Sequence, residues 1–65
     1  RTREFTEVEV RGQRIAVKIA RDQDGAVVRR EPEFRDVAAA ARVLGISERT
    51  MLDLAKEAAS GLSTS

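Results

Sequence analysis

The chain has 65 residues, no cysteine and no histidine, and its 12 basic and 11 acidic residues give a net charge of +1. This length allows one small domain, and the missing residue types exclude a disulfide scaffold, a zinc finger, a thiol nucleophile and a His-based triad. The balanced charge also lacks the basic excess of most nucleic-acid-binding faces.

Apolar side chains are numerous but small, which predicts a thin hydrophobic core. Ten residues are alanine, and Phe5 and Phe34 are the only aromatics. In such a short chain, the free energy gained by burying apolar surface barely exceeds the conformational entropy lost on folding, so its stability is marginal. We therefore expect exposed apolar surface or a homo-oligomer that covers it. No segment approaches the ~20 apolar residues of a membrane span and none resembles a signal peptide, so we expect a cytoplasmic protein without membrane contact.

The first half of the chain predicts a three-stranded antiparallel meander. Apolar residues alternate with charged ones around residues 6–10 and again over 13–21, the pattern of half-buried strands. Arg11-Gly12 separates these strands, and the turn-forming residues 22–25 precede a third strand at 26–30.

The second half predicts two helices joined by a tight turn. The first helix is expected from Pro32, a residue favoured at the first helical position, to Leu44. Gly45 ends it, Ser47 caps a second helix, and Gly61 stops that helix. The expected inner positions of the two helices are Phe34, Val37, Ala38, Ala41, Leu44, Met51, Leu54, Ala55 and Ala58. The fold class is therefore α+β, in the order βββαα, as one domain over 1–65 with a frayed tail at 62–65.

Carboxylates gather where the sheet gives way to the helices, in the segment Glu31–Asp36. Glu33 and Asp36 fall in the first helical turn, where they favour the positive end of the helix dipole. The same pair also suits a hydrated divalent metal ion. The sequence leaves both interpretations open.

Residues 37–52 are similar to a helix-turn-helix, with small residues on the first helix and Gly45 in the turn. A DNA-reading second helix needs basic or amide side chains on its outer face. After Arg49 that face carries Asp53, Lys56 and Glu57, which leaves it nearly neutral. Nucleic-acid binding is therefore a minor alternative.

Four segments carry a more extensive resemblance through their order and spacing. They are Phe5-x-x-Val8-Glu9, Gly12-x-Arg14-Ile15-x-Val17-Lys18-Ile19-Ala20, Glu31-Pro32-Glu33-Phe34-x-Asp36 and Ala41-x-x-Leu44-Gly45-Ile46. Together they resemble the C-terminal part of the nickel insertion protein family over about residues 3–60.

This resemblance implies a C-terminal fragment of a CTP-dependent nickel chelatase, a lyase-type cyclometallase that makes the nickel-pincer cofactor of lactate racemase. It implies nickel as substrate ion and CTP bound with magnesium or manganese. Arg14, Lys18 and Arg29 are the candidate nucleotide contacts, and Glu33 and Asp36 the candidate metal ligands. The fragment alone is expected to be inactive, and a structural oligomerisation module without a site remains the other alternative.

Overall fold

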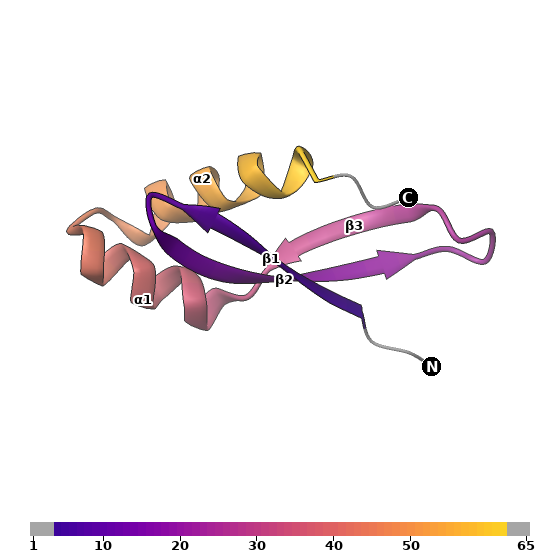
Figure 1. The fold of residues 1–65 in the computed structure, drawn as a ribbon, viewed down its shortest axis with the longest axis horizontal. Helices are drawn as coiled ribbons and strands as arrows, with labels where there is room; N and C mark the ends of the chain where they lie inside the picture. The colour runs from indigo at the N-terminus through magenta and orange to yellow at the C-terminus, as the bar shows by residue number, and fades with distance from the viewer. Residues whose placement is uncertain (1–3, 63–65) are drawn as a thin grey trace.

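The computed structural model describes residues 4–62, which form a three-stranded sheet and two helices (Figure 1). The elements are β1 (Glu4–Val10), β2 (Gln13–Arg21), β3 (Val27–Pro32), α1 (Phe34–Leu44) and α2 (Glu48–Ser60). The sheet is antiparallel in the order β1-β2-β3, so the predicted α+β fold and its βββαα order are confirmed. Of the tail expected at 62–65, residues 63–65 lie outside the described residues.

The strands alternate as the sequence predicts. Ile15, Val17 and Ile19 of β2 are buried on the helix side, and Val8 and Val10 of β1 join them there. Glu7, Glu9, Arg14 and Lys18 point to the opposite face, which no helix covers, because successive side chains of a strand alternate between faces. Glu4 and Arg30, which pair with Ile19, lie on the helix side at the end of the sheet. The sheet therefore has one buried face and one solvent face.

The junction between β3 and α1 differs from the prediction. Pro32 was expected to open the first helix, but it is the last residue of β3, paired with Val17, and the helix begins at Phe34. The Glu33 N–H donates to the Ala16 carbonyl oxygen at 2.8 Å. Along an antiparallel strand, the N–H groups of successive residues point alternately toward and away from the neighbouring strand. Because the N–H of Glu33 points toward β2, the nitrogen of Pro32 points away from it and needs no hydrogen. A proline is therefore tolerated there.

The helix ends follow the predicted capping residues. Gly45 adopts the left-handed conformation (φ 70°) that ends α1, and the Ser47 side chain accepts a hydrogen bond from the Thr50 N–H at 3.0 Å. Gly61 follows the last residue of α2. Among the described residues, no helix has the length and apolar character needed to cross a membrane.

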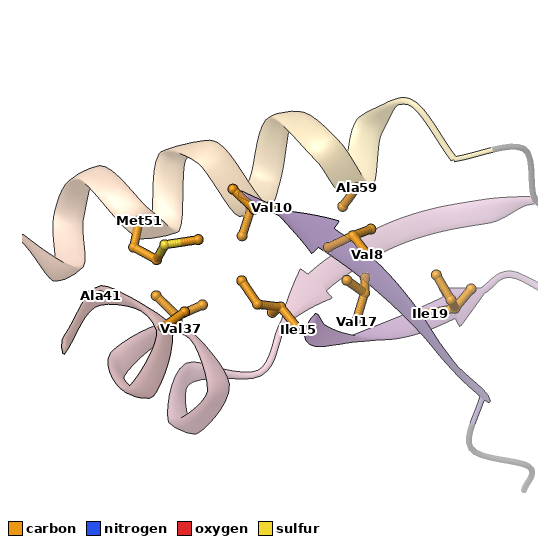
Figure 2. Packing of buried hydrophobic residues seen from close by; sticks show 11 residues of the cluster. Val8, Val10, Ile15, Val17, Ile19, Val37, Ala41, Met51 and Ala59 are labelled. Carbon is orange, nitrogen blue, oxygen red and sulfur yellow. The ribbon is translucent and has the colours of Figure 1, made fainter. Parts of the chain in front are cut away.

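The core lies between the buried face of the sheet and the two helices (Figure 2). Ile15, Val17, Val37 and Met51 are its largest fully buried side chains. The helices contribute mainly alanine, so the layers approach closely. Two helix predictions were wrong: Phe34 is 62% exposed, and Ala40 is buried where Ala38 was expected.

Candidate functional site

The three basic residues predicted to contact a nucleotide lie on the solvent face of the sheet. Arg14 and Lys18 are exposed residues of β2, and Arg29 is an exposed residue of β3 opposite Ala20. Residues that face each other across a ladder share a face, and so do residues two apart on a strand. Lys18 and Arg29 are thus diagonal neighbours, about 7 Å apart at the backbone, whereas Arg14 lies about 13 Å along the strand from Lys18.

Carboxylates partner two of these three cations. Arg14 lies 3.9 Å from the Glu7 carboxylate, and Arg29 lies 3.7 Å from that of Glu31. Both pairs are exposed, so water screens them and they hold the side chains weakly. Within residues 4–62, Lys18 has no ion pair, although Glu31 is its neighbour across the ladder. Of these three cations, Lys18 is therefore the one whose charge is most available to an added anion.

Glu33 and Asp36 both meet β2 at Ala16. The Asp36 Oδ2 atom accepts a hydrogen bond of 2.9 Å from the Ala16 N–H, and the Ala16 carbonyl accepts from the Glu33 N–H. Asp36 thus completes the ladder just past the end of β3. This position lies on the same strand as Lys18, so the structure brings the two predicted sets of residues to neighbouring parts of β2.

The two carboxylates do not by themselves make a metal site. Across the described part of the chain, no three Asp, Glu, His or Cys side chains come together in a way that could hold an ion. Magnesium is often held by one or two carboxylates together with substrate phosphates and water. One Asp36 oxygen is already bonded to the Ala16 N–H, which leaves its other oxygen for such an ion.

One residue of this face was not predicted to have a role. Phe5 lies directly opposite Lys18 in the β1–β2 register and is 50% exposed. Lys18 is flanked on its own strand by Ala16 and Ala20, whose small side chains leave the surrounding surface low. The sequence did contain a signal, because Phe5 is two residues from Glu7 and so belongs to the solvent face.

The helices offer little for DNA reading. Arg49, at the start of α2, lies 4.0 Å from Asp53 one turn later, and both side chains are well exposed. With Asp53 beside Arg49, the outer face of α2 stays close to neutral, as the sequence predicts, and would gain little from contacts with phosphate. This arrangement is that of a plain αα-hairpin.

Comparison with known proteins adds a family relationship. The family model described as "Nickel insertion protein" matches residues 1–52. The pyridinium-3,5-bisthiocarboxylic acid mononucleotide nickel insertion protein of Nocardioides sp. (strain ATCC BAA-499 / JS614) is 54% identical over 56 residues. The match covers 86% of this chain and 13% of that relative, so the chain spans about an eighth of its length. No solved structure matches the chain.

Proposed function

The chain belongs to the nickel insertion protein family, and we propose that it serves the nucleotide-dependent insertion of nickel into a pyridinium mononucleotide. In this proposal the full-length protein is a cytoplasmic, CTP-dependent cyclometallase of the lyase type. Nickel is its substrate ion, and its product is the nickel-pincer cofactor used by lactate racemase. The 54% identity to a nickel insertion protein over most of the chain is the observation that carries the proposal.

The part of this chain in that reaction is to hold phosphate. Lys18 supplies an exposed ammonium group without an ion pair among residues 4–62, and Arg29 lies diagonally across the ladder from it. Arg14 stands farther along β2 and reaches the more distant part of a bound nucleotide. Charge-assisted bonds from Lys and Arg to phosphate oxygens are short and strong, which suits this role.

Magnesium or manganese would be shared between the nucleotide and the carboxylates of Glu33 and Asp36. The ion supplies positive charge to the phosphates, and the phosphates supply the oxygen ligands that these two residues lack. Direct binding of nickel by this segment is not part of the proposal, because nickel prefers nitrogen and sulfur donors and the chain has no His or Cys.

Calorimetric titration of CTP into the full-length protein that contains this sequence tests the proposal. Lys18→Ala should weaken CTP binding by about 1.5–3 kcal/mol through loss of a charge-assisted bond. Asp36→Asn should reduce the gain in affinity produced by magnesium or manganese. Val43→Ala, a change at an exposed position of α1, is the control and should alter neither. Unchanged CTP affinity in folded Lys18→Ala protein would contradict the proposed role of this segment.

Self-association is a second proposal, supported by the exposed apolar side chains. Val28 and Phe34 are each at least 60% exposed. Such side chains favour burial against another surface. Sedimentation of the full-length protein should show a homo-oligomer whose population falls on dilution, and a monomer at micromolar concentration would contradict this second proposal.

A further inference from the structure

The solvent face of the sheet combines an aromatic ring, a cation and a low floor at one place. Phe5 on β1 and Lys18 on β2 are directly opposite each other in the ladder, with Cβ atoms about 5 Å apart. Ala16 and Ala20 flank Lys18 on its own strand and face the same way. The phenyl ring and the lysine side chain therefore leave the sheet side by side on its solvent face, next to the methyl groups of two alanines.

We propose that Phe5 forms a stacking platform for the planar ring of a mononucleotide whose phosphate is bound by Lys18. This inference rests on the nucleotide-binding role proposed above and adds the contact that recognises the ring. Stacking of a nucleotide base on an exposed aromatic side chain depends little on base identity, and alanine substitution of such a residue has a substantial effect on affinity. An aromatic and a lysine on one open sheet face match the two chemical parts of such a ligand.

The position of Phe5 argues against a purely structural role within this chain. The core is formed on the opposite face by residues such as Val8 and Ile15, and Phe5 contributes nothing to it while remaining 50% exposed. A half-exposed phenyl ring loses favourable burial free energy unless something else covers it. The neighbouring cation makes a ring that bears phosphate a better occupant than an uncharged apolar surface.

Two ligands share this chemistry. One is CTP, and the other is the pyridinium mononucleotide that appears in the name of the Nocardioides relative. The pyridinium ring is positively charged and would also gain a cation–π attraction to Phe5. The test therefore measures binding of both ligands to the full-length protein, with inorganic tripolyphosphate as a ligand that has no ring.

Phe5→Ala and Phe5→Leu should each weaken binding of at least one of the two mononucleotides about tenfold. Phe5→Trp, which keeps an aromatic ring, should bind that mononucleotide as tightly as the wild type does. Tripolyphosphate binding should stay unchanged in all three variants, whereas Lys18→Ala should weaken it. The mononucleotide that responds to Phe5 identifies the ring that stacks there. Val43→Ala is the control for removal of an exposed apolar side chain, and circular dichroism verifies the fold of each variant.

Several results would overturn the inference. In the first such result, Lys18→Ala lowers the affinity for mononucleotides while the folded Phe5 variants bind them as tightly as the wild type. Phe5 is then no stacking platform, and the proposed function survives. If the Phe5 variants lower tripolyphosphate and mononucleotide affinity equally, the ring acts on the phosphate site and not by stacking. If the wild type binds neither mononucleotide, the proposed function fails together with the inference.

Discussion

The carboxylate of Asp36 takes the place beside Ala16 that a residue of β3 would occupy if the strand continued. Its Oδ2 atom lies 2.9 Å from the Ala16 nitrogen, and the Glu33 N–H bonds to the carbonyl of the same residue. Both backbone groups that Ala16 directs toward β3 are thus satisfied by the start of α1. The first helical turn is therefore joined to the sheet by hydrogen bonds as well as by apolar contact.

Removal of the Asp36 carboxylate should destabilise the fold. Asp36→Ala leaves the partly buried Ala16 N–H without its acceptor, and we expect a loss of about 1–3 kcal/mol in the free energy of unfolding. Asp36→Asn keeps a carbonyl oxygen and should lose less. Urea unfolding of the two variants measures the difference, and equal stability of Asp36→Ala and wild type would show that the bond contributes nothing.

Truncation of Met51 should have a larger effect than any surface change. Its side chain is fully buried between α2, α1 and the sheet, so Met51→Ala leaves a cavity and should cost about 2–5 kcal/mol. A domain of this size has a total stability of only about 3–10 kcal/mol. Thermal unfolding should show a much lower midpoint or loss of the transition. Val43→Ala, at a 69% exposed position, should stay within about 0.5 kcal/mol of wild type.

The helix cap at Ser47 allows a smaller and more local test. Ser47→Ala removes the oxygen that accepts the Thr50 N–H and should destabilise the domain by about 1 kcal/mol. Ser47→Asp keeps an acceptor at the same place and should retain most of the stability. Ser60→Ala is the matched control, since that hydroxyl only donates to the Glu57 carbonyl in the last turn of α2. A Ser47→Ala protein as stable as the Ser60→Ala protein would refute the capping role.

Stability should depend on pH through Glu4. Two hydrogen bonds from Arg21, of 2.8 and 3.1 Å, lower the pKa of the Glu4 carboxyl below its ordinary value of 4.5. A lowered pKa in the folded state means that the pair stabilises the protein above pH 4.5 and that this stabilisation is lost as the pH falls through the folded-state pKa. The stability difference between wild type and Glu4→Gln should therefore shrink in acid.

Unfolding of both proteins at several pH values between 3 and 7, at low and high salt, provides the measurement. The pair is exposed, so we expect a small difference that high salt reduces. A difference that grows as the solution becomes more acidic would have the wrong sign and would exclude this account.

Sequence patterns predicted the strands and caps because each depends on a local signal. The alternation around Val8 and Val17 fixes which face is buried, and Gly45 and Ser47 act through their own backbone or side chain. Pro32 misled the prediction because proline suits two places equally: the first turn of a helix and a position of an edge strand that needs no N–H. Only the pairing with β2 decides between them.

The buried faces of the helices and the hydrogen bonds of the candidate site could not be predicted in full, because they depend on contacts between residues far apart in the sequence. Phe34 fits the apolar stripe by spacing, yet it stands at the margin of the arc centred on Val37 and Ala40 and remains exposed. The carboxylate of Asp36 could be placed in the first turn from the sequence. Its bond to Ala16, twenty residues earlier in the chain, requires the docked sheet.

The place of Pro32 in β3 also bears on aggregation. As a member of an edge strand, Pro32 directs its ring nitrogen away from β2, toward the open side where another chain would have to pair. A nitrogen without hydrogen cannot donate there, and the register shift between Ala20 and Arg21 interrupts the ladder toward the other end of β3. Open edges that carry a proline or a bulge resist strand addition. This side of the sheet is therefore protected against runaway cross-β growth, even at the high concentrations at which a small domain with exposed apolar residues is most vulnerable.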